Sequence, residues 1–209
     1  MKRQSLRWCV MISGRGSNLQ SVLDSFDPLN IVLVVSSQMD ALGKLKAKRY
    51  GIPVLDFCFK KTNWDEFLNI LKERKVEGLF LAGFMKIIPQ FVLDSFQNRI
   101  VNIHPSLLPL FPGLNSFEKA LQSQAQTGVS VHFVDAGIDT GQIIKQKKLS
   151  RIYTLVERRL AQMELTFTER YLATAVLRQH WSVPVNHSGE ANGEANGEAN
   201  DEAQGEGQI

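Results

Sequence analysis

Two side chains near the middle of the sequence, Asn102 and His104, could together promote acyl transfer. An uncharged amide can donate to a carbonyl oxygen as it gains negative charge, and an imidazole that titrates near neutral pH can move protons. Both follow the run 99–101, which is typical of the end of a buried strand, and residues two apart in a strand share a face. Pro105 then forbids further strand pairing. Taken alone, a turn-capping asparagine and a strand-end histidine are the simpler explanation.

A glycine-containing loop at residues 13–18 could hold an anionic ligand beside this pair. It stands between the apolar run 8–12 and apolar residues at helical spacing that start at Leu19. Free backbone N–H groups and the positive end of a helix favour an anion such as phosphate at such a turn. The loop lacks the third glycine of the dinucleotide-binding fingerprint, so it predicts a phosphate site and not a dinucleotide site.

Two more stretches could complete the site. Residues 135–141 contain two aspartates and two glycines, among them Gly137 and Asp139; a plain turn is the alternative, because Asp and Gly favour turns. Residues 83–89 form an apolar turn after another apolar run. Beside an anion loop, this turn could be one wall of a pocket for a flat, partly apolar ligand, although simple core cover would also explain it.

The elements that must position these residues alternate in type along the chain. Apolar runs predict strands and apolar residues at helical spacing predict helices. Strands are expected at 8–12, 31–35, 53–57, 76–82, 99–101, 128–134 and 143–149, and helices at 19–26, 41–50, after Asn63, at 116–123 and at 155–179. This alternation predicts a doubly wound α/β sheet, whose ligands bind at the carboxyl ends of the strands.

The composition, 44% hydrophobic and 22% charged, is that of a globular protein. No apolar run reaches the roughly 20 residues that cross a bilayer, and the short run after the basic start is typical of a strand, not of a signal peptide. Cys9 and Cys58 are expected to be reduced core thiols, and the four histidines lack metal-ligand spacing, so no metal is expected. The basic residues are scattered, which favours solvated faces over a nucleic-acid surface.

Residues 188–209 differ from the rest of the chain. They contain six acidic and no basic residues, and Gly-Glu-Ala-Asn occurs three times in succession from residue 189. Such a segment cannot bury enough apolar surface to offset its ordering entropy. The sequence therefore predicts one domain at 1–187 and a disordered, acidic, low-complexity tail at 188–209.

Four motifs in order carry a resemblance to a known family. They are Ser-Gly-x-Gly-Ser-Asn at 13–18, Leu-Ala-Gly-Phe-Met-Lys-Ile at 81–87, Asn-Ile-His-Pro-Ser-Leu-Leu-Pro at 102–109 and Asp-x-Gly-x-Asp-Thr-Gly at 135–141. Over residues 7–180 the chain resembles the phosphoribosylglycinamide formyltransferase (folate-dependent GAR transformylase) branch of the formyltransferase family. The resemblance implies a single Rossmann-like α/β domain with a mostly parallel, mixed sheet flanked by helices.

The resemblance also implies a function in purine biosynthesis: transfer of the formyl group of 10-formyltetrahydrofolate, the co-substrate, to the amine of glycinamide ribonucleotide. Asn102 would donate to the formyl oxygen, His104 would act as general acid and base, and Asp139 would tune His104 and take the amine proton through a water. The substrate-binding residues implied are Gly14, Arg15, Gly16, Ser17, Asn18 and Glu164. The folate-binding residues implied are Met85, Lys86, Ile87, Ile88, Asn102, Gly137 and Asp139.

The chain departs from the family pattern at several positions: Trp64, Leu110, Asn115, Phe117 and Leu165, together with a shortened segment 149–156. These departures keep three alternatives open: another acceptor amine, hydrolysis of the formyl-folate, or a non-catalytic folate- or nucleotide-binding paralogue. The expected partners are small molecules, with no nucleic acid and no membrane. The chain is expected to be a cytoplasmic monomer or homodimer.

Overall fold

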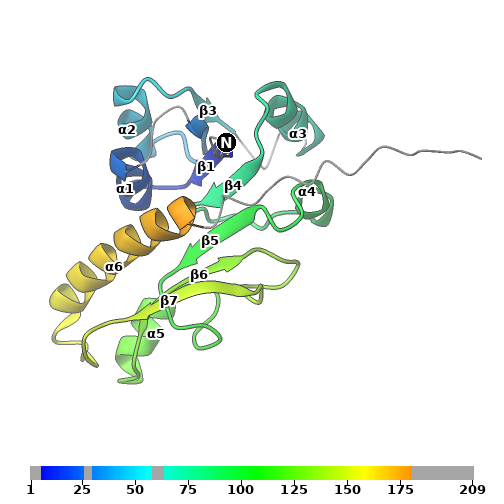
Figure 1. The fold of residues 1–209 in the computed structure, drawn as a ribbon. Coiled ribbons are helices and arrows are strands. Elements are labelled where there is room, and N and C mark those ends of the chain that lie inside the picture. The colour runs from blue at the N-terminus through cyan, green and yellow to red at the C-terminus, as the bar shows by residue number, and fades with distance from the viewer. Residues whose placement is uncertain (1–5, 26–29, 58–63, 180–209) are drawn as a thin grey trace, which may run out of the picture.

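The computed structural model describes residues 6–25, 30–57 and 64–179, and in this part of the chain one seven-stranded sheet is flanked by helices (Figure 1). The strands are β1 (Trp8–Ile12), β2 (Ile31–Ser36), β3 (Val54–Asp56), β4 (Gly78–Leu81), β5 (Ile100–His104), β6 (Gly128–Phe133) and β7 (Ile143–Lys148). The helices are α1 (Ser17–Ser25), α2 (Gly43–Arg49), α3 (Trp64–Glu73), α4 (Gln90–Ser95), α5 (Ser116–Gln122) and α6 (Arg158–Gln179).

The strand order is β3-β2-β1-β4-β5-β6-β7. The first five strands pair in parallel, whereas β6 runs antiparallel to both β5 and β7. The carboxyl ends of β1, β4 and β5 therefore lie side by side at one edge of the sheet. In the β5–β6 register, Asn102 lies opposite His132 and His104 opposite Ser130. The α/β fold with a mostly parallel, mixed sheet is confirmed.

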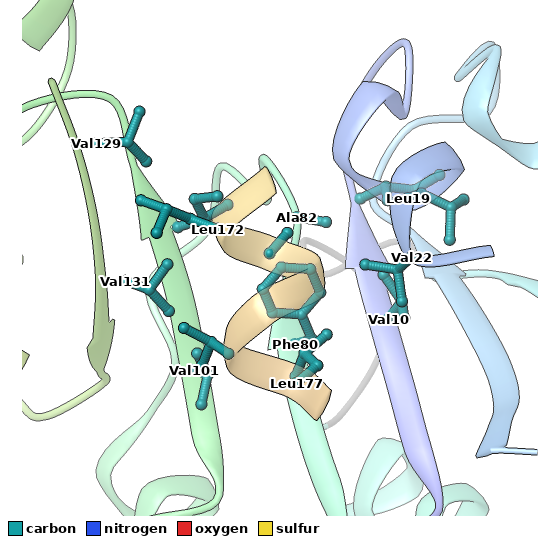
Figure 2. Packing of buried hydrophobic residues seen from close by; sticks show 14 of the residues in the cluster. Val10, Leu19, Val22, Phe80, Ala82, Val101, Val129, Val131, Leu172 and Leu177 are labelled. Atoms are coloured by element: carbon teal, nitrogen blue, oxygen red, sulfur yellow. The ribbon is translucent and has the colours of Figure 1, made fainter. Parts of the chain in front are cut away.

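Both faces of the central strands are buried, which explains their continuous apolar runs. On one face, Val10 belongs to a core that also includes residues of α1, α2, α5 and α6; on the other, Met11 belongs to a core with residues of α3 and α4. In Figure 2 the side chain of Leu177 on α6 lies beside Phe80, whereas Leu172 faces Val129 and Val131, and all of them belong to the first core. Burial of such side chains contributes about 1.5–3 kcal/mol each.

The expected strands and helices match the structure to within about three residues, with two informative differences. Helix α4 was not expected; it follows Pro89 and buries only Val92 and Leu93, a pattern too short to show helical spacing. Helix α6 begins at Arg158 instead of at residue 155, a difference of less than one turn. Just before it, the side chain of Glu157 accepts hydrogen bonds from the backbone N–H and the hydroxyl of Thr154, an arrangement typical of the start of a helix.

The predicted domain boundary at 187 and the predicted disorder of 188–209 lie outside the described residues, as do Cys58 and Asn63. Cys9 is a free, fully buried thiol, as expected, and burial raises its pKa well above its ordinary value. Within the ranges that the structure describes, no helix is both long and apolar enough to span a membrane. Among the same residues no group of three or more His, Cys, Asp or Glu side chains could hold a metal ion.

Candidate active site

Asp139 lies among polar groups contributed by two strands and a loop. Its Oδ1 accepts a hydrogen bond from Asn102 Nδ2 at 3.2 Å and lies 3.4 Å from His132 Nε2. Its Oδ2 accepts from the backbone N–H of Gly113 at 2.8 Å and lies 3.2 Å from His104 Nδ1. The three residues expected to be catalytic thus meet at the carboxyl end of β5, together with His132.

The carbonyl group of Phe111 fixes the tautomer of His104. His104 Nε2 lies 3.0 Å from Phe111 O, and because a carbonyl only accepts, Nε2 carries the hydrogen. The free position, Nδ1, then faces the carboxylate of Asp139, so a proton gained at Nδ1 forms a charge-assisted hydrogen bond. His104 is therefore built to accept a proton at Nδ1.

Burial and neighbouring charges oppose each other at this pair. Burial lowers the pKa of His104; the Phe111 carbonyl and the negative charge of Asp139 only partly offset it, and His132 lowers it further. For Asp139, burial acts to raise the pKa, but the interaction with the His132 imidazole, the hydrogen bond from the Gly113 N–H and the nearby His104 outweigh it and lower the pKa to about 2. Near neutral pH, Asp139 is therefore ionised and His104 mostly neutral.

His132 joins the cluster from the neighbouring strand. Its Nδ1 donates to the carbonyl oxygen of Phe133 at 2.7 Å, which leaves Nε2 to face Asn102 Nδ2 at 3.2 Å. The amide nitrogen of Asn102 thus donates one hydrogen bond to His132 and the other to Asp139. A ligand oxygen that binds to this nitrogen must replace one of these two partners. Sequence reasoning assigned His132 only to a strand; the signal that finds it is its position opposite Asn102 in the antiparallel register.

The two aspartates of the 135–141 loop, Asp135 and Asp139, have different roles. Asp135 Oδ1 accepts from the Gly137 N–H at 3.1 Å and from Thr140 Oγ1 at 2.7 Å, so Asp135 shapes the turn. A Cβ at Gly137 would lie 2.0 Å from Thr140 Oγ1, so any larger residue there would displace the Thr140 side chain that bonds to Asp135. Asp139 has a φ of 55°, a left-handed conformation that Asp and Asn tolerate better than most residues. The turn explanation thus holds for Asp135, while Asp139 faces the cluster.

The glycine loop at 13–18 lies at the carboxyl end of β1 and packs tightly on the start of α2. The N–H of Gly43 donates to Gly14 O at 3.0 Å, and Lys46 Nζ donates to Gly16 O at 3.0 Å. A Cβ at Gly16, whose φ is 67°, would lie 2.8 Å from the Cα of Gly43. Gly14 and Arg15 are exposed, whereas Asn18 is buried. The loop therefore presents its first residues and the amino end of α1 to solvent.

The apolar turn at 83–89 is bound directly to the glycine loop. Ser13 donates its N–H to Gly83 O at 3.2 Å and accepts the Met85 N–H at its hydroxyl oxygen at 2.9 Å. Met85 and Ile87 are 64% and 80% exposed, while Ile88 is buried and Lys86 is half-buried. Two of the expected folate-binding side chains are therefore free to contact a ligand, and Ile88 supports the turn from beneath.

Glu164 occupies a different environment. It accepts hydrogen bonds from the backbone N–H and hydroxyl of Ser150 and from the hydroxyl of Tyr153. Burial acts to raise its pKa, but these hydrogen bonds outweigh it and lower the pKa below its ordinary value. Glu164 thus holds the segment between β7 and α6 against α6. None of these hydrogen bonds connects it to Asn102, His104 or Asp139.

A doubly wound sheet with an amide, an imidazole and a carboxylate joined at its strand ends defines an α/β protein suited to acyl-group transfer. The chain belongs to the formyl transferase family, whose model matches residues 6–176. It is 37% identical over 150 residues to phosphoribosylglycinamide formyltransferase of Haemophilus influenzae, an alignment that covers 67% of this chain and 71% of the relative. It is 41% identical over 152 residues to the trifunctional purine biosynthetic protein adenosine-3 of Drosophila pseudoobscura pseudoobscura, of which it spans only 11%.

Solved structures of similar proteins share the fold. Glycinamide ribonucleotide transformylase 1 of Geobacillus kaustophilus aligns with a TM-score of 0.79 at 32% identity, covering 85% of this chain and all 100% of that one. Phosphoribosylglycinamide formyltransferase of Streptococcus pneumoniae aligns with a TM-score of 0.75 at 33% identity, covering 83% and 97%. The family expected from the four sequence motifs is thus confirmed.

Proposed function

We propose that this protein transfers the formyl group of 10-formyltetrahydrofolate to the amine of glycinamide ribonucleotide, a reaction of purine biosynthesis. The observation that carries the proposal is the cluster of Asn102, His104 and Asp139 at the carboxyl end of β5. The glycine loop after β1 lies at the same edge of the sheet, which supports binding of the ribonucleotide phosphate there, beside the proposed chemistry. The names of the relatives support the same reaction.

The chemistry divides among the three residues. The amine attacks the formyl carbon, the bond from that carbon to the folate nitrogen breaks, and the amine loses a proton while the folate nitrogen gains one. Asn102 Nδ2 donates to the formyl oxygen as it becomes negative, after giving up one of its present acceptors. His104 serves as general acid and base. The negative charge of Asp139 stabilises protonated His104, and Asp139 removes the amine proton through a water. His132 positions Asn102 and Asp139 in this scheme.

The two substrates are proposed to occupy neighbouring surfaces. The phosphate would bind at Gly14, Arg15, Gly16, Ser17 and Asn18, with Glu164 near the ribose. The pterin would bind at Met85, Lys86, Ile87 and Ile88, with Gly137 and Asp139 opposite. The bonds from Ser13 to the 83–89 turn support this arrangement, since they hold both surfaces together. A cytoplasmic monomer or homodimer without nucleic-acid partners completes the proposal.

The test uses purified full-length protein and 10-formyl-5,8-dideazafolate, with absorbance followed in the presence and absence of glycinamide ribonucleotide. Turnover only with the ribonucleotide is expected, and His104→Asn serves as the inactive control. Turnover without an acceptor would establish a hydrolase instead. Absence of turnover in both reactions, with the folate analogue still bound, would favour a binding protein or another acceptor amine.

A further inference from the structure

The side chain of Asn18 points into the protein, although the residue belongs to the glycine loop. It stands in the first turn of α1 and is only 6% exposed. Its Oδ1 is one of two buried side-chain atoms without a hydrogen-bond partner in the described part of the chain. A buried amide oxygen without a donor is costly and rare, so the surroundings of Asn18 should contain a group that can supply one.

Glu169 on α6 is the group that contacts the Asn18 side chain. The amide of Asn18 donates to the Glu169 carboxyl, which is itself half-buried where α6 crosses α1. Burial raises the pKa of Glu169 to about 7, against the opposite effect of the Asn18 hydrogen bond. A protonated carboxyl carries one O–H donor, which is the group that Asn18 Oδ1 lacks.

No charged group is among the causes of the shifted pKa of Glu169, and several titratable groups of the neighbouring elements have other partners. They include Arg170 on α6, Asp24 on α1, Lys46 and Tyr50 on α2, His132 on β6 and Lys147 on β7. Arg170 donates to the hydroxyl of Ser21 at 2.8 Å and lies 3.8 Å from Asp24. Lys46 donates to the Gly16 carbonyl, and Lys147 lies over the ring of Tyr171. The protonation of Glu169 is therefore governed by its burial and by Asn18.

We propose that Glu169 is a positioning residue for the glycine loop, acting in its protonated form by exchanging two hydrogen bonds with the Asn18 amide. Ionisation removes the bond to Asn18 Oδ1 and places a negative charge behind the anion site. Binding of a phosphate group at 13–18 is consequently coupled to uptake of a proton by Glu169. The inference rests on the proposed function, because it takes this loop to be the phosphate site.

The test measures the affinity of full-length protein for sulfate by calorimetry between pH 5.5 and 8.5. Sulfate replaces phosphate because it does not titrate in this range. For the wild type, affinity should fall several-fold as pH rises through about 7. Glu169→Gln, whose amide can make both bonds to Asn18, should bind sulfate equally well at every pH, as tightly as the wild type does at pH 5.5. The control, Glu66→Gln on the exposed side of α3, should follow the wild type.

A second measurement does not depend on a variant. The ¹³C resonance of the Glu169 carboxyl in the wild type should titrate with a midpoint near 7. A midpoint at the ordinary glutamate value, or the same fall of sulfate affinity in Glu169→Gln as in the wild type, would overturn the inference and leave the phosphate loop standing. If no protein bound sulfate at any pH, the phosphate loop itself would be wrong, and the inference with it.

Discussion

Replacing Asp139 with asparagine removes a charge and little else. The left-handed backbone at this position, with a φ of 55°, suits asparagine as well as aspartate, so the turn should survive. The asparagine oxygen can still accept the Gly113 N–H that the carboxylate accepts now. What disappears is the negative charge beside His104 and the second acceptor oxygen. Asp139→Asn therefore separates the electrostatic role of Asp139 from its place in the turn.

The structure sets the size of the effect on stability. The pKa of Asp139 lies at about 2 instead of 3.8, a difference worth about 2.4 kcal/mol of preference for the ionised, folded state. The side chain is only 14% exposed, so solvent screens little of this. Because the folded-state pKa is depressed, the contribution is complete above about pH 4 and is lost as pH falls towards 2. The free energy of unfolding of the variant at pH 7 should therefore be about 2 kcal/mol lower than that of the wild type, which corresponds to a Tm about 4–8 °C lower.

The effect on chemistry should be larger than the effect on stability. Without the carboxylate, the pKa of His104 should fall further below its ordinary value, because the charge of Asp139 now raises it. Loss of the proton acceptor should lower kcat by about 100- to 10,000-fold with little change in KM. Urea unfolding at pH 3 to 8, an NMR titration of His104 and steady-state kinetics measure the three quantities.

A neighbouring aspartate provides the control. Asp135 accepts hydrogen bonds from Gly137 and Thr140 within the turn, so Asp135→Asn should leave the pKa of His104 and kcat close to those of the wild type. An unchanged His104 pKa together with a near-normal kcat in Asp139→Asn would refute the electrostatic role and leave Asp139 as a turn residue.

Four other outcomes are expected. Asn102→Ala should fold normally and lose about 100- to 1000-fold in kcat while still binding substrate; a loss of only a few-fold would remove Asn102 from the oxyanion role. His132→Gln should lower kcat less than Asp139→Asn does, since His132 acts through its neighbours, and an equal loss in steady-state assays would contradict this. Because the pKa of Glu169 is raised, wild-type stability should fall as pH rises from about 4.5 to 7; Glu169→Gln should abolish this fall, worth up to about 3 kcal/mol in urea unfolding at pH 7. Deleting residues 188–209 should leave Tm and kcat unchanged, because their composition offers almost nothing apolar to pack; a drop of several degrees would contradict that.

The parts of the fold that were predictable from sequence are those with local signals. Apolar runs mark buried strands wherever both faces of the sheet are covered, as at 8–12 and 31–35. The pair Asn102 and His104 was visible because a strand places them on one side and Pro105 ends the strand. Each of these inferences needs only residues a few positions apart.

The contacts that were not predictable join residues far apart in the chain. His132 meets Asn102 only through the antiparallel register of β6, which periodicity does not reveal. The backbone of the loop after Pro105 supplies the Phe111 carbonyl to His104 and the Gly113 N–H to Asp139. Nearly every residue has the same backbone groups, so no sequence motif predicts which loop carbonyl or N–H will contact the site.

The departures from the family pattern have physical explanations in this fold. Phe117 and Leu165, 3% and 2% exposed, belong to the core that covers one face of the sheet. A polar side chain at either position would be buried in apolar surroundings, so these two departures favour packing over polar function. Asn115 has a φ of 58°, which asparagine tolerates well. Leu110, by contrast, is 52% exposed. Asn115 is exposed as well. Of these four departures, Leu110 and Asn115 are therefore the two whose side chains are free to meet a ligand, and they are the positions where a changed substrate preference should be sought first.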